Sequence, residues 1–241
     1  MIMDKKKRLK IQSIYDKFHK EFYSEKYKAV RDALKSISLR EKNNSKHLHD
    51  LGKFVIFYSL PTVSPKIVVI GNNPSWFHPS NSTLAKENLD DVAEKIPTIN
   101  SYKEHGHKFG DALINIFNEI GREHWIDEIV GLNRFWIQTG GKGTKELKKE
   151  CKSKKKYQDL KNLCEKYTKE LVEILNPKLI ILLGKPAQKI YKPIINNSFY
   201  NPNDSKASFI FALHPTAPRH EAWKQTADEI YTFLDENEIN Y

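Results

Sequence analysis

Short runs of apolar residues alternate along this chain with segments whose apolar residues follow a helical period. Three runs, residues 67–70, 179–183 and 209–213, end abruptly in turns that contain Gly, Pro or His. Runs of this length that end in such turns are typical of buried strands in a parallel sheet. Residues 129–137 predict a weaker fourth strand. Residues 54–60 favour a further strand that ends at Pro61.

Helices are predicted between these strands by apolar residues spaced three and four apart. One stripe runs from Phe109 to Ile120 and ends at Gly121, and a second covers residues 160–175 and ends at Asn176-Pro177. A third covers residues 223–234. Near the N-terminus, residues 4–23 and 27–39 predict two amphipathic helices, the second ending before the polar stretch 42–45.

Strands that alternate with helices predict an α/β fold. We expect a three-layer α/β/α sandwich with a short central parallel sheet over residues 54–241. Residues 1–53 would form an N-terminal helical extension packed on this core. Ligands of parallel sheets bind at the carboxyl ends of the strands, so the turns that follow the strands should meet at one crevice.

Length and composition narrow the class of protein. A chain of 241 residues with 39% hydrophobic residues can bury one good-sized domain. No apolar run approaches the roughly 20 residues that cross a bilayer, and the basic N-terminus lacks the apolar stretch of a signal peptide. We expect a cytoplasmic protein that has no membrane partner.

Charge and cysteine content limit, less strictly, which partners and metal clusters the protein could bind. The net charge of +10 suits a polyanionic partner, although a lysine-rich genome would produce the same balance. Cys151 and Cys164 are the only cysteines, so a four-cysteine iron–sulfur cluster is excluded. We expect both to be free thiols, with Cys164 on the buried face of a helix.

The turns that follow the strands carry three motifs in order. They are IVVIGNNP at residues 67–74, NLCEKYTKELVEILNPKLIILLGKPAQKIY at 162–191 and ALHPTAPRHEAW at 212–223. Together they resemble the uracil-DNA glycosylase superfamily, in particular its cluster-free mismatch-specific and single-strand-selective branches. The resemblance covers roughly residues 65–234. The chain departs from it at Ser75, where many relatives have Gly, and in His-Pro-Thr-Ala-Pro, which replaces His-Pro-Ser-Pro.

This resemblance implies a monomeric DNA glycosylase that uses no metal or cofactor. Such an enzyme flips uracil or another altered pyrimidine out of single- or double-stranded DNA and hydrolyses its N-glycosidic bond, leaving an abasic site. Asn73 would orient the attacking water, and His214 would donate a hydrogen bond to the carbonyl oxygen of the leaving base. The alternative roles are a turn asparagine and a strand-end histidine that bonds only to backbone.

Further positions follow from the same resemblance. Phe109 would stack on the flipped base, unless it is a core aromatic, and Asn133 would read the edge of the base. The pocket floor and wall would comprise Gly71, Asn72, Pro74, Ser75 and Trp76. DNA contacts would come from Lys185 and the closing loop, where Arg219 could equally be an ordinary exposed arginine. That loop comprises Pro215, Thr216, Ala217, Pro218, Arg219 and His220.

The lysine-rich tract and the histidine pairs each allow more than one interpretation. The lysine-rich tract at residues 142–156 is either a DNA contact or a solvated face. The pairs His47/His49 and His105/His107 lack a third ligand, so no metal site is expected. A catalytically weak or inactive DNA-binding module of the same fold is the main alternative function, and an α/β enzyme acting on free nucleosides is a more distant one.

Overall fold

The computed structural model describes residues 5–44, 65–72, 108–137, 139, 144–151, 153–190, 207–213 and 221–236. Their centre is a four-stranded sheet in the order β2-β1-β3-β4, and every neighbouring pair of strands is parallel. The strands are β1 (Ile67–Gly71), β2 (Val130–Asn133), β3 (Leu179–Leu183) and β4 (Ser208–Ala212). The α/β fold with a parallel sheet is therefore confirmed, and the weak fourth strand is real but shorter than predicted.

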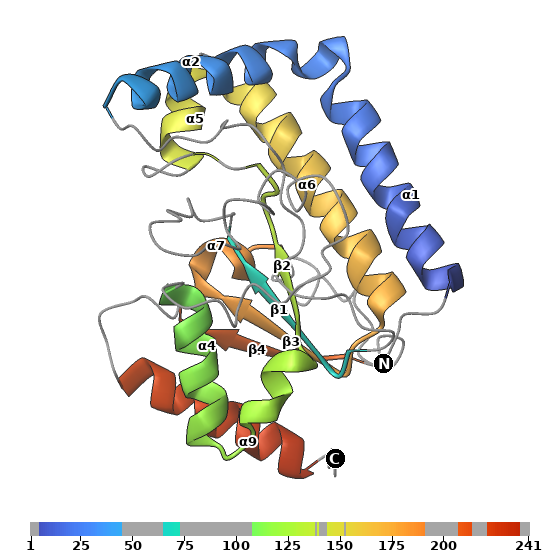
Figure 1. Ribbon diagram of the computed structural model, residues 1–241, viewed down its shortest axis with the longest axis vertical. Coiled ribbons are helices and arrows are strands. Elements are labelled where there is room, and N and C mark those ends of the chain that lie inside the picture. The colour runs from blue at the N-terminus through green and yellow to red at the C-terminus, as the bar shows by residue number, and fades with distance from the viewer. Residues whose placement is uncertain are drawn as a thin grey trace.

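Helices cover both faces of this sheet (Figure 1). All residues of β1 are buried, and they alternate between two hydrophobic clusters: Val68 and Ile70 belong to one, Ile67 and Val69 to the other. This alternation is the period-two geometry of a strand. A strand packed on both faces must be apolar at every position, which explains the continuous apolar runs of β1 and β3. The run at 209–213 was wrongly predicted to be buried throughout, because β4 is at the edge of the sheet and Phe211 and Leu213 are exposed.

The helices divide between the faces according to the chain order. One face is covered by α4 (Lys108–Glu119), the 3-10 turn η3 (Glu123–Asp127) and α9 (Glu221–Glu236). The other is covered by α6 (Lys154–Leu175), with α1 (Lys5–Phe22), α2 (Lys28–Asn44) and α5 (Thr144–Glu150) packed around it. A short turn, η1 (Glu25–Tyr27), joins α1 to α2.

The C-terminal ends of α4 and α6 are set by residues that take a left-handed backbone conformation. After α4, Gly121 has φ +66°, and the N–H of Arg122 donates to the carbonyl of Phe117 at 2.8 Å, which is a Schellman end. After α6, Asn176 takes the left-handed conformation with φ 51° before Pro177. Both predicted ends are confirmed.

The structure corrects the predicted end of one helix and adds two helices that the sequence did not predict. The second N-terminal helix does not end before the polar stretch 42–45, because α2 continues to Asn44. Two short helices were not predicted: α5, in the lysine tract, and α7 (Gly184–Gln188), which begins in the turn after β3. Both are polar and shorter than the window in which helical periodicity is visible. The predicted strand at 54–60 lies outside the described residues.

The first helix is joined to the core through α6. Ile11, Ile14, Tyr15, Phe18 and Phe22 are all buried, as the helical spacing predicted. The Phe18 ring lies 4.5 Å from that of Trp136 and 5.9 Å from that of Tyr167, measured between centroids. The Tyr167 hydroxyl donates to the carboxylate of Glu21. Within the described residues, no helix is long and apolar enough to span a membrane.

Candidate functional site at the carboxyl edge of the sheet

The carboxyl ends of the four parallel strands lie along one edge of the sheet. Gly71 of β1 is in register with Asn133 of β2, and Leu183 of β3 is in register with Ala212 of β4. Strands β1 and β4 are separated only by β3, so their ends are about 10 Å apart at 4.8 Å per strand. The chain segments that lead into positions 73, 184 and 214 therefore leave the sheet side by side.

The connections from β1 and β2 lead to opposite faces of the sheet. The chain after β1 returns through α4 on one face, and the chain after β2 returns through α6 on the other. The strand order itself reverses between β1 and β3, and open α/β sheets bind ligands outside the carboxyl ends of the strands at such a point. Gly71 ends β1 beside this point, and Asn133 is its partner at the end of β2.

The Asn133 side chain lies directly against Gly71. A Cβ atom added to Gly71 would be 3.4 Å from Asn133 Oδ1, which is van der Waals contact, so the amide lies close against the Gly71 backbone. Pairing continues beyond the strands, because the N–H of Arg134 donates to the Gly71 carbonyl and that of Phe135 to the Asn72 carbonyl, both at 2.9 Å. Asn133 is 2% exposed, so its amide is enclosed by the protein.

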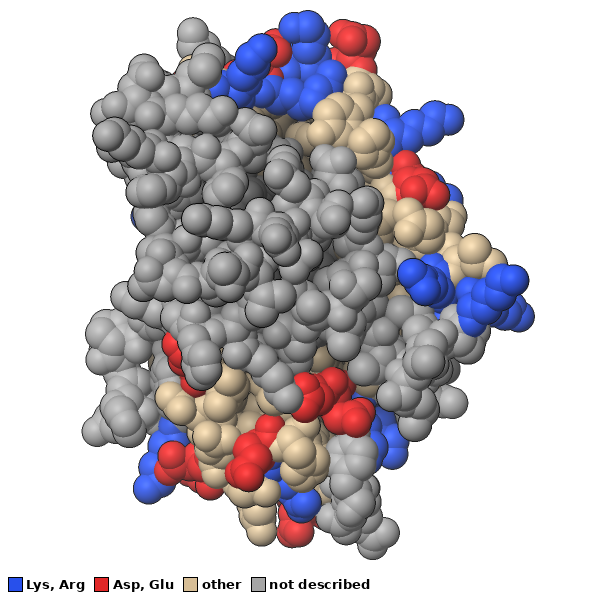
Figure 2. Space-filling model, viewed as in Figure 1, with Lys and Arg blue, Asp and Glu red and all other residues tan. Residues whose placement is uncertain are grey.

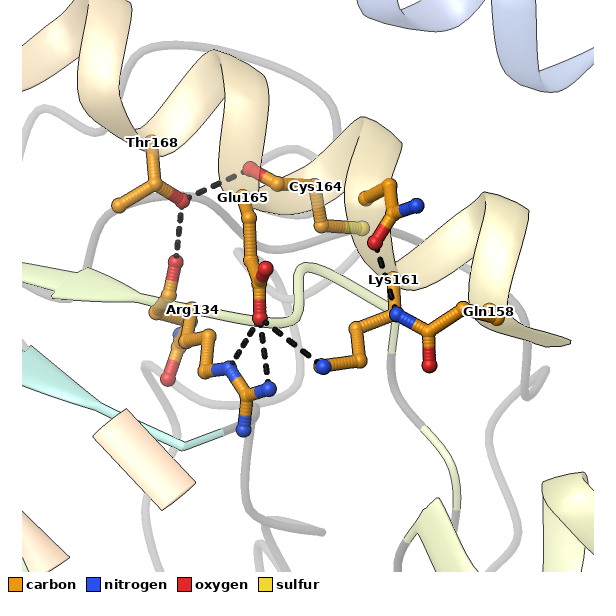
Figure 3. Close-up of polar contacts among 8 residues, drawn as sticks. Arg134, Gln158, Lys161, Cys164, Glu165 and Thr168 are labelled. Carbon is orange, nitrogen blue, oxygen red and sulfur yellow. Dashed lines mark hydrogen bonds and ion pairs between the residues drawn. The ribbon is translucent and has the colours of Figure 1, made fainter. Parts of the chain in front are cut away.

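The backbone carbonyl of Asn133 is fixed from the other side by α6. The indole Nε1 of Trp136 donates to this carbonyl at 2.9 Å and lies 3.0 Å from Thr168 Oγ1. The Thr168 hydroxyl is 2.9 Å from both the Asn133 carbonyl and the Cys164 carbonyl, and can donate its one hydrogen to either (Figure 3). All of these groups are buried, where leaving a polar group without its hydrogen bond is costly.

A charged pair lies immediately beside this network. Arg134 is 6% exposed, and its Nε and Nη2 atoms each lie 2.6 Å from Glu165 Oε1. Lys161 approaches the same oxygen at 3.5 Å (Figure 3). Two donors of one guanidinium on one carboxylate oxygen fix the direction of the Arg134 side chain. The residue after Asn133 is thereby anchored to α6.

The other predicted site residues that the structure describes lie along the same edge. Asn72 is half-buried at the end of β1, and Lys185 is exposed in the first turn of α7, two residues after β3. Phe109 is the second residue of α4, and its side chain is not described. The remaining predicted residues lie outside the described residues: Asn73, Pro74, Ser75, Trp76, His214, Pro215, Thr216, Ala217, Pro218, Arg219 and His220.

Sequence reasoning missed the groups that hold Asn133 in place. An arginine enclosed by apolar residues, as in the stretch GLNRFW, does indicate a buried charge that needs a partner. Its partner Glu165 is 31 residues away in sequence, so its identity depends on how α6 packs on β2. Thr168 lies on the apolar stripe of α6, where a polar residue likewise indicates a buried hydrogen bond.

The two thiols are free, as predicted, and Cys151 is buried as well as Cys164, for which burial was predicted. Burial raises the pKa of the Cys164 thiol to about 12 and that of the Cys151 thiol to about 11. Thiols with such a pKa are poor nucleophiles at neutral pH. Within the described part of the chain, no group of three His, Cys, Asp or Glu side chains could hold a metal ion.

Comparison with known proteins does not assign this chain to a family. No protein-family profile matches the sequence, and no curated protein is significantly similar to it. Its function must therefore be inferred from its own residues and their arrangement.

Proposed function

We propose that this protein is a DNA glycosylase of the uracil-DNA glycosylase superfamily fold, which hydrolyses the N-glycosidic bond of uracil or another altered pyrimidine. The main support is the pairing of Gly71 with a buried Asn133 at the carboxyl edge of a parallel sheet. The motif-bearing turns of the sequence begin at the neighbouring strand ends, along this edge.

The proposed chemistry requires two groups on either side of one extruded nucleotide. Cleavage produces an oxocarbenium-like sugar and an anionic base, so a held water and a hydrogen-bond donor to the base would both act on the transition state. Asn73 would hold the water and His214 would be the donor. They follow Asn72 and Leu213, the first residues after β1 and β4, whose ends are about 10 Å apart. This separation is comparable with the length of a nucleotide.

Asn133 would read the edge of the extruded base. An amide offers one acceptor and two donors, so it can match the neighbouring acceptor and donor of a pyrimidine edge. Such readout needs an amide that does not turn, since a freely rotating one would accept several bases. The close approach of Asn133 Oδ1 to Gly71 and the burial of the side chain support this role.

Base release from oligonucleotides tests the proposal. Wild-type protein is incubated with single- and double-stranded DNA that contains uracil, and abasic sites are detected by alkaline cleavage. We expect cleavage that is unaffected by excess EDTA, and a loss of at least about tenfold in rate for Asn73→Ala and for His214→Ala. Asn118→Ala, which changes an exposed asparagine on α4, is the matched control and should retain the full rate.

Two results would contradict this mechanism: loss of activity on chelation, or full activity in both variants. A panel of duplexes with other modified bases, read by mass spectrometry of the released base, would identify the substrate. Salt-dependent DNA binding with no base released from any member of the panel would instead support a DNA-binding module that lacks catalysis.

A further inference from the structure

The lysine tract that follows β2 forms an exposed surface in the structure. On α5, Lys145, Lys148 and Lys149 are exposed and share one side of the helix, opposite the buried Leu147. The first turn of α6 adds three more exposed lysines. We call these six residues the lysine surface: Lys145, Lys148, Lys149, Lys154, Lys155 and Lys156.

The charges of this surface are not balanced by ion pairs. Among the residues that the structure describes, none forms an ion pair with any of the six lysines. The six ammonium groups lie within twelve residues that contain two carboxylates, Glu146 and Glu150, so the segment keeps a net positive charge that a polyanion would neutralise. Figure 2 shows further Lys and Arg side chains at the end of the molecule where α2 lies in Figure 1, with Asp and Glu side chains among them.

The composition of the surface distinguishes among polyanions. Every exposed position of α5 is a lysine, whereas a helix that lies on a membrane carries Trp, Phe or Leu beside its basic residues. A protein interface would likewise be expected to expose aromatic or apolar residues at its centre. Lysines act as flexible point charges, which suits the regularly spaced phosphates of a nucleic acid backbone.

The position of the surface follows from the direction of α6. Only three residues separate the end of α6 at Leu175 from the start of β3 at Leu179, so α6 runs antiparallel to the strands. Thr168 is level with the end of β2, because it contacts the Asn133 carbonyl. Lys154 is fourteen residues earlier, which places it about 21 Å beyond the carboxyl edge at 1.5 Å per residue.

We propose that the lysine surface binds the phosphate backbone of duplex DNA about 6 base pairs to one side of the extruded nucleotide. The figure is 21 Å divided by the 3.4 Å rise per base pair, for a duplex whose axis runs along α6 away from the carboxyl edge. The position relative to that nucleotide depends on the proposed glycosylase function, whereas the binding of backbone phosphate does not. The surface would thus extend the bound stretch of DNA well beyond the site itself.

The test compares two variants that each lose three positive charges. One is Lys145→Gln/Lys148→Gln/Lys149→Gln. The control is Lys5→Gln/Arg8→Gln/Lys10→Gln on the exposed side of α1. Because α1 runs antiparallel to α6, with Glu21 beside Tyr167 and Tyr27 beside Asp159, these control residues lie toward the opposite edge of the sheet.

Binding is measured on a duplex with a tetrahydrofuran abasic analogue, as a function of salt. For the α5 variant, we expect the slope of log binding constant against log salt to become shallower by about 2–3, close to 0.9 for each phosphate that the variant no longer neutralises. The α1 variant should keep the wild-type slope. An unchanged slope in the α5 variant, or an equal change in both variants, would overturn the proposal.

Shortened duplexes test where the lysine surface binds relative to the extruded nucleotide. The flank on one side of the analogue, and then on the other, is cut to fewer than about 6 base pairs. One of the two cuts should weaken DNA binding by the wild type to the level of the α5 variant, and the same cut should leave binding by the α5 variant unchanged. If each cut weakened the wild type and the α5 variant equally, the proposed position would be overturned. Since binding is read on an abasic analogue, a failure to release any base would defeat the proposed function without altering this result.

Discussion

At the scale of single residues, the segment that follows β2 combines a buried charge with a buried hydrogen-bond network. Arg134 and Trp136 lie on either side of Phe135, and both bond to α6. Taking an ion pair out of water costs free energy, so such a pair adds little net stability, yet removing one partner leaves the other charge uncompensated. The pair therefore defines where β2 is held relative to α6.

Removing one side chain of the Arg134–Glu165 pair should destabilise the fold more than removing both. We expect Arg134→Met to lower the free energy of unfolding by about 3 kcal/mol, because Glu165 would keep only Lys161 at 3.5 Å. The double variant Arg134→Met/Glu165→Leu should recover at least half of that loss. Urea denaturation of the three proteins provides the measurement.

The matched control is Lys28→Met, which breaks the exposed pair Lys28–Asp32 and should cost no more than about 0.5 kcal/mol. A loss below about 1 kcal/mol for Arg134→Met would mean that Glu165 gains solvent when its partner is removed. The pair would then not hold β2 against α6.

At the scale of elements, α6 is the helix around which one face of the molecule is built. Its buried residues span more than a narrow stripe: Thr168 and Val172 are buried in addition to the predicted apolar positions. The stripe is wide because the sheet covers one side of α6 and α1 covers another (Figure 1). A helix with two packing partners needs a broader apolar surface than one that covers a sheet alone.

The N-terminal helix should accordingly contribute to the stability of the whole core. We expect Phe18→Ala to lower the free energy of unfolding by about 3–5 kcal/mol, since this fully buried ring packs on Trp136 and Tyr167. Leu9→Ala removes a side chain that is 62% exposed on the same helix, and should change it by less than about 0.5 kcal/mol.

Circular dichroism and tryptophan fluorescence should report the same transition in both variants. Trp136 lies on the α1 face of the sheet and Trp125 on the opposite one. If Phe18→Ala produced an early loss of helical signal while the fluorescence transition stayed at the wild-type position, α1 would unfold separately from the core.

At the scale of the whole molecule, two buried thiols make the fold sensitive to alkaline pH. Cys164 and Cys151 have a raised pKa in the folded protein, near 12 and 11, because burial disfavours the thiolate. In the unfolded chain they lose their protons near the ordinary value of 9.0. Above that pH the unfolded state binds fewer protons than the folded state, so stability falls as pH rises.

This stabilisation should be fully present below pH 9 and decline above it. From pH 8 to pH 10 we expect the free energy of unfolding to fall by about 2–3 kcal/mol from the two thiols together. Cys164→Ala should remove about half of that fall. Urea denaturation at the two pH values measures it, and identical falls in the wild type and in Cys164→Ala would contradict the assignment to this thiol.

Prediction from the sequence succeeded wherever a structure depends on neighbours in the chain. The apolar runs of β1 and β3, the five buried positions of α1 and the ends at Gly121 and Asn176 all follow from periodicity or backbone conformation. Short polar elements escaped prediction, since α5 and α7 have too few residues to show a period. The roles of Asn73 and His214 stay predictions.

Local pattern and composition were enough to predict the α/β class, the free thiols and the strands that precede the motif-bearing turns. The strand order β2-β1-β3-β4, the contact of Asn133 with Gly71 and the partner of Arg134 depend instead on the tertiary structure. The last two join residues 62 and 31 positions apart. Such pairs form only when α6 packs on the sheet and the strands take their register, which no local pattern encodes.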